Sequence, residues 1–496
     1  MESTDDIIDI ISKFEENGMI LTSHGLDRII SNTLNLDEVI KKAKERNVWL
    51  ISDEFIVEFI DDRFKKFEKD VGLKKTKRIL SKETDSELKI YKDYDVTGKS
   101  TCEGKIEDFL IYFNQKYENI KEILRERPYM RSPVPIKVLK KQNRGIDLQF
   151  IGMITDKIES KRGYRFLHIE DTTGDIRVLI PKDNRELNEI FDNILLDDVI
   201  GITGRMHNDL FIANSIYQPD LPINHRTFSA PEDICMAMIS DIHVGSYLFL
   251  EKEFKYFINC LNLKGGNKEI FERVKYILIA GDLVDGIGIY PEQEEELSIP
   301  DIYKQYDFLA SLLEKIPDHI EIVVSMGNHD AVRVAEPQPR LSRDIGAPLY
   351  DLPNVHVCGN PVMISTHGVK TLIYHGTSLD SIIGNLAKCT YNRPEVAMVE
   401  YLKRRYLVPS YGSNVIAPEK KDYFFIKEIP DILHCGHIHT NGYTNYRGVR
   451  VINSGTFQAR TKYQEEQGHI PTPGRVPIIN LQNHEVSVIH FYNEEG

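Results

Sequence analysis

The sequence has little of what marks exported, membrane-spanning or DNA-coating proteins. Its six cysteines lie far apart without a Cys-x-x-Cys pair, which argues against a zinc knuckle and favours a reducing, cytosolic setting. Asp and Glu outnumber Lys and Arg by 76 to 62, and the net charge of −14 excludes a polybasic coat but not a local basic groove. No basic amino-terminal region is present, and no apolar run approaches the roughly 18 residues that span a bilayer. We therefore expect a soluble cytoplasmic protein without a membrane anchor.

The chain is too long for one typical hydrophobic core, since it has 496 residues. The chain contains segments with apolar residues at helical spacing, charged segments, and segments in which polar and apolar residues alternate. The predicted units are a helical module (1–62), a charged linker (63–105), a connecting helix (106–133), a β-barrel (134–222) and an α/β domain (229–496). The helical module has no catalytic cluster, so we expect a packing role there, with docking as the alternative.

Residues 134–222 contain several short strands of alternating polarity, closed by turn signals and interrupted by one helical patch. This pattern predicts a five-stranded barrel of the oligonucleotide-binding (OB) type. Phe150, Tyr164, Phe166 and Arg177 could stack on bases, as side chains of such barrels do. The alternative is that these side chains lie in the core or face a neighbouring domain, because the sequence does not fix the face of each strand.

Five apolar segments in the last domain each end just before residues that bind metal ions. Continuous β-branched runs are typical of strands buried on both faces, and ligands at their carboxyl ends converge on one crevice. The side chains concerned are Asp241, His243, Asp282, Asn328, His375, His437 and His439. Any one of these histidines alone is better explained as a core or surface residue, but the whole set predicts a metal site.

The ligand chemistry fits two divalent ions about 3.5–4 Å apart. We expect Asp282 to bridge the ions, because a carboxylate has two oxygens. We expect one ion on Asp241, His243 and His439, and the other on Asn328, His375 and His437. Mixed imidazole, amide and carboxylate ligands without a thiolate suit Mn²⁺, with Fe²⁺ or Zn²⁺ as alternatives, and indicate a catalytic site. Such a pair lowers the pKa of a bridging water, which then attacks phosphorus.

His329 directly follows the predicted ligand Asn328 and is therefore expected at the rim of the metal cluster. There it can stabilise the transition state or protonate the leaving alkoxide. We expect Asp330 to orient the ring of His329. A purely structural His329 is the alternative.

These residues form motifs that resemble those of the calcineurin-like metallophosphoesterases. The motifs are Asp241-Ile242-His243, Gly281-Asp282-Leu283-Val284-Asp285, Gly327-Asn328-His329-Asp330, His375 and Gly436-His437-Ile438-His439. The resemblance covers the last half of the chain and implies two packed mixed sheets flanked by helices, with a dinuclear centre at the loop ends. It also implies that Asp285 supports the ligands instead of binding metal.

A barrel ahead of a phosphoesterase domain is similar to the layout of the B subunits of replicative DNA polymerases, and 402–419 and 463–477 resemble the small subunit of the archaeal family D enzyme. The resemblance implies a 3′–5′ proofreading exonuclease, associated with the nucleoid, that works on single-stranded or primer-terminal DNA beside a large catalytic subunit. Eukaryotic B subunits have lost the ligands, whereas this sequence has all of them. Within this picture Arg404 and Arg405 could contact phosphates, and an ion-paired surface is the alternative.

Two other functions stay open from the sequence alone. The chain could be a noncatalytic scaffolding subunit whose cleft holds metal but is idle. It could also be a phosphatase for proteins or small phosphoesters. The stretch after Gly281 lacks the Asp-Arg-Gly continuation of the protein phosphatases, and a phosphatase gives the barrel no obvious task.

Overall fold

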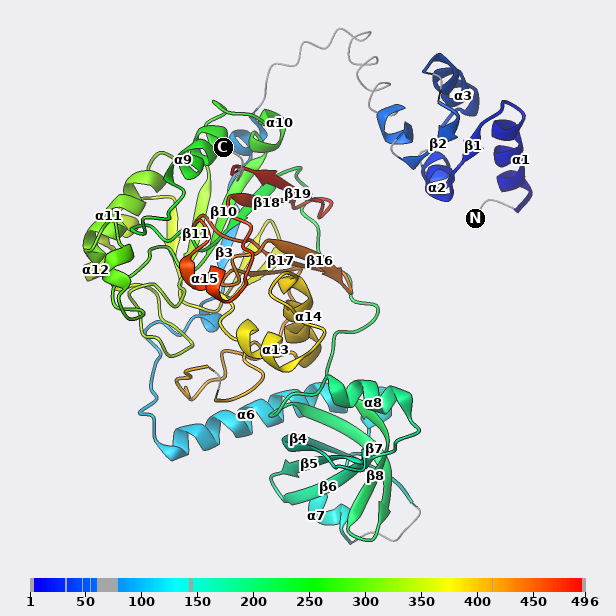
Figure 1. Ribbon diagram of the computed structural model, residues 1–496, viewed down its shortest axis with the longest axis vertical. Helices are drawn as coiled ribbons and strands as arrows, with labels where there is room; N and C mark the ends of the chain where they lie inside the picture. The colour runs from blue at the N-terminus through cyan, green and yellow to red at the C-terminus, as the bar shows by residue number, and fades with distance from the viewer. Residues whose placement is uncertain are drawn as a thin grey trace. The chain divides into compact units, whose positions relative to one another are not determined.

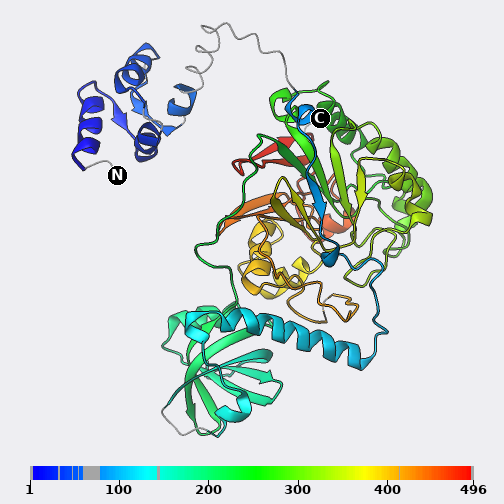
Figure 2. The ribbon, with the colours of Figure 1, turned by 180° about the vertical axis from the view of Figure 1, so that it is seen from behind.

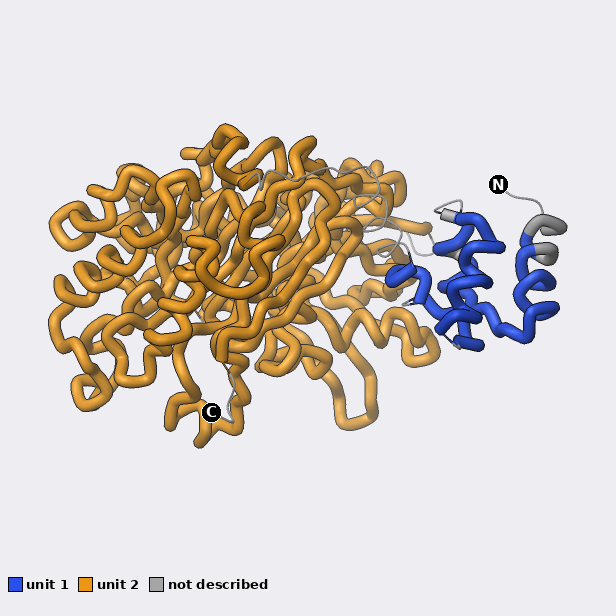
Figure 3. Tube along the Cα trace, turned by 90° about the horizontal axis from the view of Figure 1, so that it is seen from above, with its two compact units in different colours: residues 1–78 blue, residues 79–496 orange. Residues whose placement is uncertain are grey.

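The computed structural model describes residues 4–31, 34–46, 48–53, 55–59, 79–141, 146–412 and 414–492. The chain forms two compact units, Met1–Arg78 and Ile79–Gly496 (Figure 3). Where the structure describes the chain, every helix is too short or too polar to cross a bilayer.

The first unit is a small helical module with one short pair of strands. Its elements are α1 (Thr4–Glu15), β1 (Ile20–Leu21), α2 (Ser23–Ser31), α3 (Leu36–Glu45) and β2 (Leu50–Ile51). The strands pair in parallel, and Phe14, Val39 and Ile56 are fully buried between the helices. Asn35 caps α3, because its side chain accepts hydrogen bonds from the first backbone amides of the helix. The helical region predicted at the amino terminus is confirmed, and the two strands were too short to predict.

The second unit contains a closed five-stranded barrel, as predicted. Its strands are β4 (Asp147–Glu159), β5 (Arg165–Asp171), β6 (Gly174–Ile180), β7 (Val199–His207) and β8 (Leu210–Tyr217), in the order β4-β5-β6-β8-β7. Helix α8 (Arg185–Asp192) follows β6. The aromatic ring of Phe150 is fully buried in the barrel against Phe211, at 5.0 Å between ring centroids. Phe150 is therefore a core residue and not a base-stacking one, whereas Tyr164 is 45% exposed on the outside.

Two six-stranded mixed sheets follow in the same unit. The first contains β9 (Cys235–Ile239), β10 (Val274–Ala280), β11 (Glu321–Ser325), β12 (Val355–Val357), β18 (Arg475–Asn480) and β19 (Val486–His490). The second contains β3 (Leu88–Ile90), β13 (Val362–Thr366), β14 (Val369–Ile373), β15 (Ile432–Cys435), β16 (Gly442–Tyr446) and β17 (Val449–Asn453). Strands β9, β10, β11 and β12 run parallel, as do β14, β15 and β17. Each set of parallel strands therefore presents its carboxyl ends at one edge.

The sheets pack face to face and helices cover their outer faces (Figures 1 and 2). The outer helices are α9 (Glu251–Leu261), α11 (Ile302–Leu313) and α12 (Arg343–Tyr350) on the first sheet, and α13 (Leu379–Asn385) and α14 (Pro394–Arg404) on the second. Along β9, Ala237 and Ile239 face the helices while Met236 and Met238 face the second sheet. Because both faces of the strand are buried, its sequence is continuously apolar. The predicted two sheets flanked by helices are confirmed.

The structure differs from the predicted charged linker at 63–105. Residues 63–78 lie outside the described residues, but β3 pairs with β13 in the second sheet, with Ile90 opposite Ile364. A three-residue edge strand between charged segments is too short for an alternating pattern to reveal. Helix α6 (Ile106–Arg125) lies within the segment 106–133, where a connecting helix is predicted. The hydroxyl of Tyr117 on this helix donates to the carbonyl of Ile151 in the barrel at 3.2 Å.

Candidate metal centre

The seven predicted ligands lie together at the carboxyl ends of five strands. Strands β9, β10 and β11 lead into the loops that carry Asp241 and His243, Asp282, and Asn328; β14 and β15 lead into those that carry His375, His437 and His439. The ligands come from both sheets because the two sets of parallel strands end at the same edge of the sandwich. The crevice that is predicted from the apolar runs therefore lies at this edge of the sandwich.

Five of the seven predicted ligands have a left-handed backbone conformation. The ligands with positive φ are Asp241 (49°), His243 (53°), Asp282 (50°), His437 (67°) and His439 (39°). This conformation costs roughly 1 kcal/mol or more for a residue with a Cβ, and such strain gathers at functional sites. Glycines beside the ligands make room for them: a Cβ on Gly327 would lie 2.2 Å from Oδ1 of Asp282.

Three of the ligands form one cluster of donor atoms. Nε2 of His439 lies 3.3 Å from Oδ1 of Asp241 and 3.2 Å from Nε2 of His243. Ligand atoms that share one ion at about 2.0–2.2 Å lie roughly 3 Å from one another. The three side chains therefore have the spacing of a common ion.

A second cluster surrounds the amide oxygen of Asn328. Its Oδ1 lies 2.9 Å from Nε2 of His375 and 3.1 Å from Nδ1 of His437. Oδ2 of Asp282 lies 3.3 Å from Nε2 of His375 and 3.8 Å from Nε2 of His243. Asp282 thus faces both clusters, as a bridging ligand must.

The carboxylates of the clusters are ionised in spite of their burial. Burial opposes the charged form of Asp282, but the imidazoles of His375 and His329 outweigh it and hold the pKa of Asp282 well below its ordinary value. Burial also opposes the charged form of Asp241, but its pKa is lowered, chiefly by the hydrogen bond with His439. Burial likewise disfavours a charge on His375, but Asp282 outweighs it and raises the pKa of His375 to about 10. Ionised carboxylates in a buried site suit divalent cations, and the His and Asp clusters indicate metal binding.

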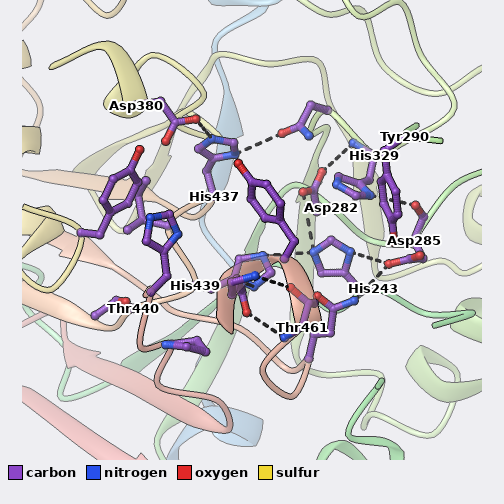
Figure 4. A pocket seen from close by; sticks show the side chains of 18 of the residues that line it. His243, Asp282, Asp285, Tyr290, His329, Asp380, His437, His439, Thr440 and Thr461 are labelled. Atoms are coloured by element: carbon purple, nitrogen blue, oxygen red, sulfur yellow. Dashed lines mark hydrogen bonds and ion pairs between the residues drawn. The ribbon is translucent and has the colours of Figure 1, made fainter. Parts of the chain in front are cut away.

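Side chains outside the clusters fix the orientation of the imidazole rings (Figure 4). Asp285 lies beside His243, with 3.0 Å between Oδ1 and Nδ1, which agrees with the supporting role that the resemblance implies. The sequence pattern does not indicate Asp380, whose Oδ2 lies 2.9 Å from Nε2 of His437. Asp380 stands in the first turn of α13, where a carboxylate is normally explained by the helix dipole. The position of Asp380 in the sequence therefore does not indicate that its carboxylate contacts His437.

We predict that Asp380→Ala weakens metal binding without unfolding the protein. The carboxylate holds the ring of His437 with Nδ1 toward Asn328, and loss of such a partner typically costs about 10–100-fold in metal affinity. Titration of the protein with Mn²⁺ should show this rise in dissociation constant. Asp344→Ala is the matched control, because Asp344 is an exposed carboxylate in the first turn of α12. Equal affinity in the Asp380 and Asp344 variants would contradict the role.

His329 lies in the wall of the same cavity but is not oriented by Asp330. Its Nδ1 donates to the carbonyl of Asp285 at 2.8 Å, and its ring edge packs against His243 at 4.7 Å between centroids. The carboxylate of Asp330 instead accepts from the amides of Gly327 and Leu283, at 2.8 and 3.2 Å, and from the hydroxyl of Tyr306. Burial raises the pKa of Asp330 to about 7. The prediction for Asp330 is corrected: it ties two ligand loops together, because adjacent loop residues point in opposite directions.

The two arginines predicted to contact phosphates are buried in contacts within the protein. Nε of Arg404 donates to Asp198 at 2.9 Å, and its Nη1 pairs with Glu400. Arg405 donates to the carbonyls of Ile426 and Lys427. Arg404 is 4% exposed and Arg405 is 5% exposed. The prediction of DNA contacts is therefore corrected, because both guanidinium groups are occupied between elements of the fold.

A cavity of about 570 Å³ opens over the ligands. Its walls come from the loop after β10, the start of α13 and the segment around α15 (Lys462–Glu466). The ligands His243, Asp282, Asn328, His437 and His439 form its floor, and His329 stands beside them. This volume accommodates the end of a substrate rather than a whole duplex.

Comparison with known proteins supports this chemistry. The family model of the calcineurin-like phosphoesterases matches residues 236–441. The DNA polymerase II small subunit of Methanocaldococcus jannaschii is 44% identical over 434 residues, covering 86% of this chain and 73% of that protein. The same subunit of Archaeoglobus fulgidus is 44% identical over 412 residues, covering 82% of this chain and 81% of that protein. The similarity thus extends well beyond the phosphoesterase domain.

Proposed function

Because this chain belongs to the family of DNA polymerase II small subunits, we propose that it is the 3′–5′ proofreading exonuclease of a DNA polymerase. The observation that carries the proposal is the complete ligand set, with all seven side chains gathered in two adjoining donor clusters and five of them lining one cavity. An idle scaffolding subunit would not need to retain strained backbone at five of these positions. The substrate is DNA with a free 3′ end, single-stranded or at a primer terminus.

The chain's own residues hold the centre and the reacting groups in place. Bound divalent ions, with Mn²⁺ as the first choice, would supply an activated water and neutralise the phosphate oxygens. Asp241, His243 and His439 would hold one ion, and Asn328, His375 and His437 the other, with Asp282 between them. Asp285 and Asp380 fix the rings of His243 and His437. His329, held through Nδ1, leaves Nε2 to contact the departing oxygen.

We propose a large catalytic polymerase subunit as the partner, because the relatives are named small subunits. The acidic net charge of the chain supports this assembly, since DNA is then held largely by the partner. The complex works on DNA in the cytoplasm, at the nucleoid.

The test is incubation of the purified chain, alone and with its large subunit, with Mn²⁺ and a 5′-labelled single strand. We expect a ladder of products shortened from the 3′ end, and none in the presence of a chelator. 4-Nitrophenyl phosphate serves as the substrate of the phosphatase alternative. A folded, Mn²⁺-loaded chain that hydrolyses this ester but leaves DNA intact would overturn the proposal.

A further inference from the structure

The wall of the cavity over the metal ligands has an unusual charge for a DNA site. Among the described residues that line it, none is Lys or Arg, whereas Asp285, Glu296 and Asp380 contribute carboxylates. Beyond the metal ligands, the described wall therefore offers phosphate groups no Lys or Arg side chain and some repulsion from carboxylates. Affinity for a strand inside the cavity must come from another part of the nucleotide.

Aromatic side chains occupy the wall instead. Tyr463 is 67% exposed and Tyr290 is 38% exposed, and both line the cavity. Tyr391 stacks on His469 with 4.0 Å between ring centroids and 29° between the ring planes. Tyr290 lies beside His329 (Figure 4), and its hydroxyl donates to Glu296 at 2.9 Å. The rings thus stand on more than one wall around the ligands.

The segment that carries Tyr463 is tied directly to a predicted metal ligand. The amide group of Gln464 lies 2.9 Å from Nδ1 of His439, and its oxygen accepts from the backbone amide of Thr461 at 3.0 Å. The amide of Thr472 also donates to the carbonyl of His439 at 2.9 Å. The backbone that carries Tyr463, next to Gln464, is therefore tied to the loop of His439.

On the basis of the proposed function, we propose that Tyr290, Tyr463 and the Tyr391–His469 pair bind the unstacked terminal bases of a DNA strand. The rings make the cavity selective for an unpaired end. A paired terminal base is held in the duplex by its partner strand and by the neighbouring base on one face, whereas a frayed base is free to enter the cavity and place a face on an aromatic ring. Stacking is tolerant of sequence, because every base has a π-face. A mispaired terminus frays more readily and would therefore enter more often than a paired one.

The test compares two 5′-labelled single strands, one natural and one with abasic tetrahydrofuran residues at its last two positions, cleaved by the full chain with Mn²⁺. The phosphodiesters are the same in both, so only the contribution of the bases differs. We expect the wild type to cleave the abasic end with about 10–100-fold lower kcat/KM, because each of the two missing bases would contribute roughly a factor of ten if it stacks. Tyr463→Ala should lose about tenfold on the natural strand and little on the abasic strand, and Tyr463→Phe should restore the difference.

Tyr443→Ala is the matched control, because Tyr443 is 50% exposed on β16 and does not line the cavity. Equal cleavage of the two strands by the wild type would overturn the stacking proposal while leaving the exonuclease intact. An equal loss on both strands in Tyr463→Ala would also overturn it. Failure of the wild type to cleave either strand would count against the proposed function.

Discussion

Asp282→Asn is expected to abolish cleavage of DNA by this protein. Oδ2 of Asp282 faces both donor clusters, at 3.3 Å from His375 and 3.8 Å from His243, so an amide there removes the one negative charge that both ions would share. Loss of metal-ion catalysis costs several kcal/mol of transition-state stabilisation, and we expect kcat to fall by roughly 10³-fold. Single-turnover cleavage of a 5′-labelled strand with saturating Mn²⁺ measures the effect.

Asp351→Asn is the control for this substitution, because Asp351 is an exposed residue that follows α12 and does not line the cavity. It should cleave like the wild type. Circular dichroism should show that both variants are folded. Residual cleavage in Asp282→Asn within tenfold of the wild type would mean that Asp282 is not shared by two ions.

Arg404→Ala is expected to destabilise the protein strongly and to leave the chemistry of cleavage unchanged. The guanidinium pairs with the buried carboxylates of Asp198, directly before β7, and Glu400, on α14. Removal of one partner of a buried pair typically costs about 3–5 kcal/mol, because the remaining charge is left without compensation. Lys388 and Lys403 still neutralise Glu400, so the stranded charge is Asp198. Urea unfolding should report the loss as a lower midpoint.

Two further measurements show whether Arg404 acts within the fold or on DNA. The double variant Asp198→Leu, Arg404→Leu removes both charges and should recover much of the lost stability, since apolar pairs often replace buried ion pairs at little cost. Below the unfolding transition, Arg404→Ala should keep the KM and the salt dependence of the wild type. A raised KM with a shallower salt dependence in the folded variant would restore the predicted phosphate contact.

The sequence predicts well which side chains gather at the strand ends, because each one follows a strand that is buried on both faces. Such strands appear as unbroken apolar runs, and in a parallel sheet their ends meet whatever the loops between them do. The runs before Asp241, Asp282 and Asn328 are adjacent strands of one sheet. The run before His375 pairs with the run before His437 in the other. The ligand positions therefore need no knowledge of side-chain packing.

The supporting residues escape prediction because their roles depend on contacts between distant loops. Asp380 reaches His437 from 57 positions away, and Gln464 reaches His439 from 25 positions away. Residues that are adjacent in the sequence can also mislead, because their side chains can face different parts of the fold. Asp330 follows His329 in the sequence, but its carboxylate faces the backbone of the ligand loops. Arg404 and Arg405 both point into the protein, Arg404 toward Asp198 and Arg405 toward the carbonyl of Ile426. Sequence patterns indicate which element a residue belongs to, but not which loop will fold over it.

The central claim is that seven side chains hold two neighbouring ions at the strand ends. Electron paramagnetic resonance of the protein titrated with Mn²⁺ tests it most directly, because ions about 3.5–4 Å apart are spin-coupled. We expect two Mn²⁺ per chain with a coupled signal, and loss of the coupling in Asp282→Asn. A single ion per chain, or two ions with the spectrum of isolated Mn²⁺, would contradict the account.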